Sequence, residues 1–138
     1  MKVADYRLDD IEVGSVHEFM RIISEKEVDE FAALTGDFNP LHVDNSYAGS
    51  TRFGKRVSHG MLSASLFSTL IGMICPGKRS LYLSQTLNFR EPVFPGSSLI
   101  IRGTVTSKAE GLQIITMKTQ IINGGRIAID GEAKVKLL

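Results

Sequence analysis

The sequence predicts an α+β fold in which an antiparallel sheet wraps around one long central helix. Residues 60–74 are apolar over the length of a helix, and the second half of the chain consists of strand-like segments joined by short turns. No repeat, low-complexity tract or linker divides the 138 residues. One domain spanning residues 1–138 is therefore the expected organisation.

A strand and a capped helix are expected first. Residues 15–23 mix apolar and polar side chains in the manner of a strand. Ser24 and Glu27 fit a capping box, in which the serine is the N-cap and the glutamate occupies the third helical position. The helix that follows carries apolar side chains on one face, and Gly36 is its expected C-cap.

A long connection separates this helix from the central one. Pro40 has no amide hydrogen and disfavours the α region at the preceding residue, so we expect residues 37–42 to form a stiff, irregular loop. A short helical stretch is expected around residues 44–48. The central helix, residues 60–74, is apolar all round, which is typical of a helix buried on every side.

The remaining segments predict strands. Four of them are separated by the turn-forming pairs Pro95-Gly96, Glu110-Gly111 and Asn123-Gly124, and the last pair is a strong signal for a type I′ hairpin. The expected strands are 81–90, 99–106, 112–122 and 127–137.

Composition excludes several classes of protein. The chain is 43% hydrophobic and 22% charged with a net charge of +1, which gives no case for nucleic acid or an anionic membrane as a partner. The single cysteine, Cys75, cannot form an internal disulfide, and we expect it to be buried as a small hydrophobe. The N-terminus has no secretory signal and residues 61–75 are too short for a membrane span, so the cytoplasm is the expected location.

Asp37 and His42 are the first candidates for chemistry. An acid and a histidine held near each other on a rigid segment are what proton transfer requires. The alternative is an Asx-turn at the aspartate and a surface histidine. A metal site is a further alternative, although its four possible ligands match no familiar zinc spacing: Asp37, His42, Asp44 and His59.

The start of the central helix is the second candidate. The first amide hydrogens of a helix are unpaired, and Gly60 would let a ligand approach them closely, as in an oxyanion hole. The alternative is that the glycine only permits tight packing. Ser68 lies eight residues further on, about 12 Å along the helix, and cannot share one carbonyl oxygen with Gly60.

Two segments resemble a known family. The run from Phe31 to His42 resembles the hydratase 2 motif of the MaoC-like dehydratase family, and the segment Val57 to Leu62, with the helix as far as Ser68, is also similar. The resemblance covers roughly residues 10–138. Within the family, the chain looks like the short, single-domain (R)-specific enoyl-CoA hydratases.

The resemblance implies a hot-dog fold and a homodimer. It implies that Asp37 and His42 are the catalytic acid–base pair, that Gly60 supplies the oxyanion-hole amide, and that Ser68 lies close to the pair. No metal or cofactor belongs to the family's mechanism. We also expect contacts with substrate from Asn39, His59, Lys55 and Arg56, because the basic loop could meet the phosphates of coenzyme A. Lys78 and Arg79 are further candidates for these phosphates.

The implied substrate is an acyl thioester of CoA or of acyl carrier protein. The implied reaction is reversible addition of water to a trans-2-enoyl thioester, a lyase reaction of fatty-acid metabolism or of polyhydroxyalkanoate precursor supply. Three alternatives remain at this point: a hot-dog thioesterase, a 3-hydroxyacyl-ACP dehydratase of fatty-acid synthesis, and a thioester-binding module without activity.

Overall fold

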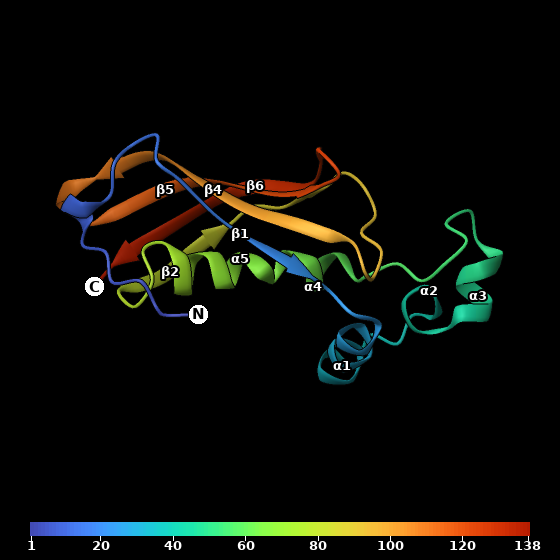
Figure 1. The fold of residues 1–138 in the computed structure, drawn as a ribbon. Coiled ribbons are helices and arrows are strands. Elements are labelled where there is room, and N and C mark those ends of the chain that lie inside the picture. Colours follow the sequence, from blue (N-terminus) through green and yellow to red (C-terminus); the bar gives the residue numbers. More distant parts are fainter.

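A computed structural model describes all of residues 1–138. Its main feature is a six-stranded sheet that curves over a central helical segment (Figure 1). All neighbouring strands are antiparallel, in the order β1-β4-β5-β6-β2, and β3 also pairs with β6. This confirms the predicted α+β architecture. The strands are β1 (Val16–Ile22), β2 (Ser80–Gln85), β3 (Asn88–Phe89), β4 (Ser98–Ala109), β5 (Ile114–Asn123) and β6 (Arg126–Leu137).

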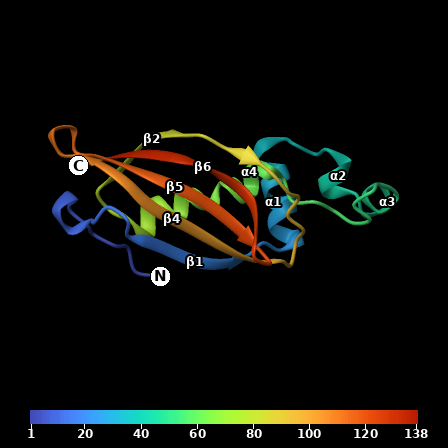
Figure 2. The same cartoon turned by 90° about the horizontal axis from the view of Figure 1, so that it is seen from above.

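The central helical segment is less regular than predicted. It consists of α4 (Gly60–Ala64), α5 (Leu66–Thr69) and a wider π-helical turn (Leu70–Ile74), which follow one another beneath the sheet (Figure 2). The break falls at Ser65, whose amide is shared between two preceding carbonyls, those of Met61 at 2.9 Å and Leu62 at 3.1 Å. A serine hydroxyl that bonds back to the preceding turn distorts a helix in this way, and that of Ser65 donates to the Leu62 carbonyl.

One face of this segment packs on the sheet and the other does not. Phe67, Leu70 and Ile71 are buried in a core cluster of 22 residues that takes its other members mainly from the strands. Met61, by contrast, is 58% exposed, and Ser65 and Ser68 are exposed beside it. The prediction of a helix buried on every side is therefore wrong for the single chain, because the sheet covers only one side.

Three short helices project beyond one end of the sheet: α1 (Glu25–Thr35), α2 (Pro40–Val43) and α3 (Asn45–Ser50) (Figure 1). The predicted capping box of α1 is confirmed, since Ser24 Oγ accepts from the Glu27 amide at 3.1 Å and the Glu27 carboxylate accepts from the Ser24 amide at 3.0 Å. Gly36 ends the helix in the left-handed conformation, with φ of 81°.

The segment from Asp37 to His42 is more ordered than the irregular loop that we predicted. Pro40 is the first residue of α2, where a missing amide hydrogen costs nothing because that amide has no partner within a helix. Asn39 caps this single turn through its side-chain oxygen, which accepts from the Leu41 amide at 3.0 Å. His42 is therefore carried on a helical turn.

Two details of the predicted strands differ. The hairpin between β5 and β6 has Gly124 and Gly125 at its centre, with φ of 58° and 78°, while Asn123 pairs with Arg126 as part of the ladder. A type I′ turn requires positive φ at both central residues, and two glycines meet this requirement more easily than an Asn-Gly pair. The predicted strand 81–90 is divided into β2 and β3 after a register shift between Tyr82 and Ser84. Single 3₁₀ turns lie at Leu8–Asp10 and Glu110–Leu112.

Cys75 is fully buried in the core, as predicted. Burial raises the pKa of its thiol to about 12, because the thiolate would lose its hydration there. A protonated, inaccessible thiol is unreactive, so Cys75 fills space in the core.

None of the helices has the length and apolar character that crossing a membrane requires.

Candidate active site

Asp37 lies in the turn between α1 and α2. Its carboxylate oxygen Oδ1 accepts from the Asn39 amide at 3.1 Å, which is the Asx-turn that the sequence allowed. Its own amide donates to Thr35 Oγ1 at 3.2 Å. The side chain is 51% exposed, so the second oxygen, Oδ2, is open to solvent or to a ligand. The turn therefore holds the carboxylate in place through Oδ1 and leaves Oδ2 available.

His42 presents a free ring nitrogen. Its Nδ1 lies 2.7 Å from the main-chain oxygen of Val57. A carbonyl oxygen can only accept, so Nδ1 carries the hydrogen and the neutral ring keeps its lone pair on Nε2. An imidazole oriented in this way can take a proton at Nε2.

His59 joins these two residues. It is only 2% exposed and forms a tilted stack with His42, with ring centroids 4.0 Å apart. Its Nε2 lies 3.0 Å from the main-chain oxygen of Asp37. One ligand atom each from Asp37, His42 and His59 falls within a span of 4.8 Å. The structure thus brings the predicted acid and histidine together.

Gly60 is the first residue of α4, directly after His59. The first amides of a helix have no partner within it, and they carry the positive end of the helix dipole. A Cβ atom at this position would lie 2.8 Å from two ring carbons of Phe89. The position therefore has room for a glycine only, unless the Phe89 ring moves.

A cavity of about 400 Å³ lies against Gly60 and His42. The ring of Phe89 forms part of its wall, and Arg52 and Arg90 add basic side chains to it. Arg90 is bound to Asp130, with Nε 2.8 Å from Oδ2, and this hydrogen bond lowers the pKa of the Asp130 carboxyl.

Two hydroxyls in this cavity were missed in the sequence. Ser58 and Ser63 line the cavity, are buried, and their Oγ atoms have no hydrogen-bond partner. Their positions two residues before and three after Gly60 were the available signal. Ser63 lies three residues after Gly60 and therefore on the same face of the helix, whereas Ser58 precedes the helix and no periodicity places it.

Ser68 does not join the acid–base pair in the single chain. It lines a second cavity of about 500 Å³ on the exposed face of α4 and α5, with Met61, Tyr82 and Gln85. Neither Asp37 nor His42 borders that cavity. The position agrees with the distance of about 12 Å that eight helical residues impose between Ser68 and Gly60.

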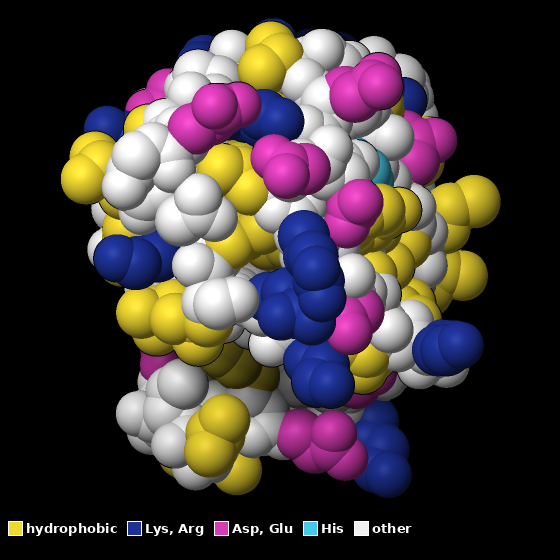
Figure 3. Space-filling view, turned by 90° about the vertical axis from the view of Figure 1, so that its left-hand side faces the viewer, with side chains coloured by type: hydrophobic (Ala, Val, Ile, Leu, Met, Phe, Trp, Pro, Cys, Tyr) yellow, Lys and Arg dark blue, Asp and Glu magenta, His cyan; other side chains and the backbone are white.

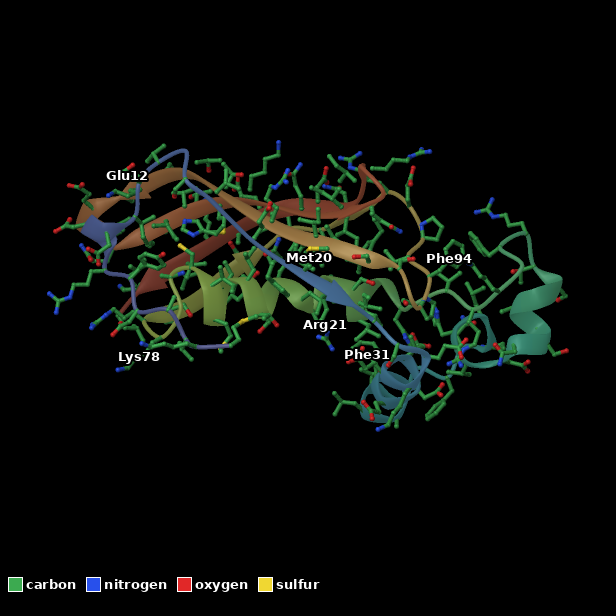
Figure 4. The ribbon with its side chains drawn as sticks, viewed as in Figure 1. Glu12, Met20, Arg21, Phe31, Lys78 and Phe94 are labelled. Atoms are coloured by element: carbon green, nitrogen blue, oxygen red, sulfur yellow. The ribbon has the colours of Figure 1, made fainter.

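The predicted phosphate-binding residues separate into three groups. Arg56 is 5% exposed, and its guanidinium binds the Asp29 carboxylate and the His42 main-chain oxygen, so it presents no exposed group to a phosphate within one chain. Lys55 is exposed, with Nζ 4.6 Å from the centre of the Phe94 ring. Lys78 lies at the opposite end of the molecule (Figure 4).

That opposite end faces the viewer in Figure 3, and its basic side chains are interspersed with acidic ones. Arg79 is part of this mixed surface, since it forms an ion pair with Asp5. Neither Lys78 nor Arg79 therefore belongs to the site around His42 within one chain.

Of the four residues considered as metal ligands, three lie together and one does not. Asp44 instead caps α3, where its Oδ1 accepts from the Tyr47 amide at 3.0 Å. His42 and His59 each direct one ring nitrogen at a main-chain carbonyl, and the remaining nitrogen of His59, Nδ1, is buried. A metal bound to all three residues would therefore have to use this buried nitrogen or displace the hydrogen bond between His59 Nε2 and the Asp37 carbonyl.

The sheet wrapped around a helix, with an acid and a histidine beside the helix start, defines a hot-dog protein with an acid–base site. Comparison with known proteins agrees with this class. Residues 11–124 match the family described as the MaoC like domain, and the chain belongs to this family.

Relatives resemble the chain over nearly its whole length. It is 46% identical to the (R)-specific enoyl-CoA hydratase of Aeromonas caviae, over 92% of this chain and 96% of that protein. It is 37% identical to the (R)-specific enoyl-CoA hydratase of Rhodospirillum rubrum, over 92% and 88%. The unliganded R-hydratase PhaJ1 of Pseudomonas aeruginosa superposes with a TM-score of 0.94 at 38% identity, covering 98% of this chain and 87% of that one.

Proposed function

We propose that this protein is an (R)-specific enoyl-CoA hydratase, which adds water reversibly to a trans-2-enoyl thioester. The observation that carries the proposal is the orientation of His42, whose Nδ1 is bound to the Val57 oxygen so that Nε2 is free, in a cluster with Asp37 near the start of α4. The names of the relatives at 46% and 37% identity support it. They give no support to the thioesterase alternative.

In this proposal, Asp37 and His42 act on one water molecule. Both side chains offer an acceptor, so together they can orient the water toward the electron-poor C3 of the substrate. One of them removes a proton from the water as its oxygen bonds to C3. A proton is then delivered to C2, which completes the (R)-3-hydroxyacyl thioester, and the same steps reversed dehydrate it.

The Gly60 amide stabilises the charge that develops. As C3 is attacked, negative charge moves to the thioester oxygen as an enolate, and a backbone amide at a helix start is suited to bind it. One such donor contributes about 3–4 kcal/mol to transition-state stabilisation. The absence of a side chain at this position lets the Phe89 ring pack against the start of α4, and Gly60 still borders the cavity.

The surroundings suggest where the rest of the substrate and a second chain lie. The cavity that contains Ser68 is apolar and follows the exposed face of the helical segment, so we propose that it receives the acyl chain. The cavity also borders β2, an unpaired edge strand of the sheet on which Leu81 and Leu83 are 47% and 48% exposed. A homodimer formed along this edge would cover the cavity and the exposed leucines.

The first test compares wild type with Asp37→Asn on crotonyl-CoA, by following the absorbance of the conjugated enoyl thioester. We expect rapid loss of absorbance with wild type and a fall in kcat of at least about 100-fold in the variant, because an amide cannot act as a base. Asp44→Asn is the matched control. Asn caps a helix as well as Asp does, so this variant should keep wild-type activity.

Two results would contradict the proposal. One is a wild type that leaves crotonyl-CoA and longer enoyl thioesters unchanged, and the other is release of free thiol from acyl-CoA, which would indicate a thioesterase. Activity that survives in a folded Asp37→Asn would reject the role of the carboxylate but not the hydration reaction.

A further inference from the structure

We infer that His59 is a positioning residue, which fixes the positions of Asp37 and His42 relative to the Gly60 amide. The inference rests on the proposed function, because it concerns the geometry of that site. His59 immediately precedes Gly60 and is the residue from which α4 begins. Its side chain points back toward the projecting helices, where it meets the two segments that carry the acid and the base.

Two aromatic rings contact the His59 ring. One is Phe31 of α1, with ring centroids 4.8 Å apart and planes tilted by 58°. The other is His42 of α2, with centroids 4.0 Å apart and planes tilted by 30°. Aromatic rings in contact at these distances restrict each other's rotation. The ring of His42 is therefore fixed from two directions, by the stack and by its Nδ1 bond to the Val57 oxygen.

A nitrogen at the edge of the His59 ring binds the main chain of Asp37. His59 Nε2 lies 3.0 Å from the main-chain oxygen of Asp37, which can only accept, so this nitrogen carries the hydrogen. The same nitrogen is 3.9 Å from Asp37 Oδ2, too far for a hydrogen bond. His59 therefore anchors the backbone of Asp37 and leaves the carboxylate free for water.

The other ring nitrogen of His59, Nδ1, is buried and has no hydrogen-bond partner. Because Nε2 is directed at the Asp37 carbonyl and the residue is only 2% exposed, His59 presents no accessible nitrogen to substrate within one chain. Its burial also argues against the substrate contact expected from the sequence.

One side chain therefore links the three segments that carry Asp37, His42 and Gly60. The turn before α2 is short and largely exposed, so few other contacts fix its distance from the central helix. A displacement of the reacting groups by 1 Å can lower the reaction rate about 100-fold. A replacement that cannot donate at the position of Nε2 should accordingly lower kcat while leaving substrate affinity nearly unchanged.

The test compares His59→Leu with His59→Gln. Glutamine can place an amide N–H where Nε2 was, and leucine cannot. We expect kcat to fall about 30- to 100-fold in the leucine variant with KM within about threefold of wild type, and to recover to within about tenfold in the glutamine variant. His17→Gln, on β1 and away from the site, is the matched control and should leave both constants unchanged.

A second measurement does not depend on activity. Histidine ring ¹⁵N spectra should show wild-type His42 as a single Nδ1–H tautomer. In His59→Leu the ring loses the stack and is held by the Val57 oxygen alone, so we expect it to leave that oxygen part of the time and to show an averaged mixture of tautomers. The inference is overturned by a leucine variant with near-wild-type kcat, by a loss carried by KM alone, or by equal losses in the two variants. If wild type itself hydrates no enoyl thioester, the proposed function fails, and the spectra alone decide whether His59 fixes His42.

Discussion

At the residue scale, contacts between segments distant in the chain orient the catalytic side chains. Which nitrogen of His42 is free depends on the Val57 carbonyl, 15 residues further along the chain. The burial of His59 and Arg56 depends on contacts with α1 and α2. In the sequence, Asp37 and His42 can be identified because an acid, a proline and a histidine occur within six residues, but no local pattern reports these contacts.

Gly60 gives a prediction at the same scale. In Gly60→Ala, the new methyl group would meet the Phe89 ring at 2.8 Å and would also narrow access to the amide. We expect kcat/KM for crotonyl-CoA to fall at least about tenfold, since small displacements at a reacting centre are costly. Gly72→Ala is the control within the same helical segment, because its Cβ would meet no atom within 4 Å. Equal effects at the two glycines would show that Gly60 matters for helix packing only.

At the element scale, prediction succeeded where the signals were local. The capping box of α1 is specified by two residues three positions apart, and it forms as expected. The interruption at Ser65 accompanies the hydrogen bond from its hydroxyl to the Leu62 carbonyl, and the division of β2 from β3 follows a register shift against β6. Residue type did not reveal either, because serine occurs in regular helices and strands as well.

Removal of the α1 cap should destabilise the fold. Ser24→Ala deletes the acceptor for the Glu27 amide, and we expect the free energy of unfolding to fall by about 1 kcal/mol, measured by urea denaturation. Ser24→Asp retains an acceptor and should stay close to wild type. The main-chain hydrogen bond from Ser24 lowers the pKa of Glu27, so the contribution of this charge is present above its ordinary pKa and is lost as the pH falls below it. An unchanged midpoint of urea denaturation in Ser24→Ala would show that packing alone stabilises α1.

At the scale of the whole molecule, the pattern predicted a sheet around a helix, but only the family resemblance implied how chains assemble. Periodicity marks the apolar faces of the central segment without saying what covers each one. The sheet covers Phe67 and Leu70, whereas the face with Met61 and Ser68 is open in one chain. A second chain is the covering partner that the proposed homodimer supplies.

This assembly can be tested on the two edges of the sheet. Leu83→Lys places a charge on the β2 edge, beside the open helix face, and Met20→Lys places one on β1, where Met20 is 69% exposed. Burying one leucine contributes about 1.5–3 kcal/mol, so we expect Leu83→Lys to weaken dimerisation at least about tenfold while Met20→Lys leaves it unchanged. Light scattering across a dilution series measures both. A monomeric wild type would contradict the dimer, and dissociation by Met20→Lys alone would move the interface to the β1 edge.

Because Ser68 borders the open face, loss of the dimer should also raise KM for long acyl chains more than for crotonyl-CoA.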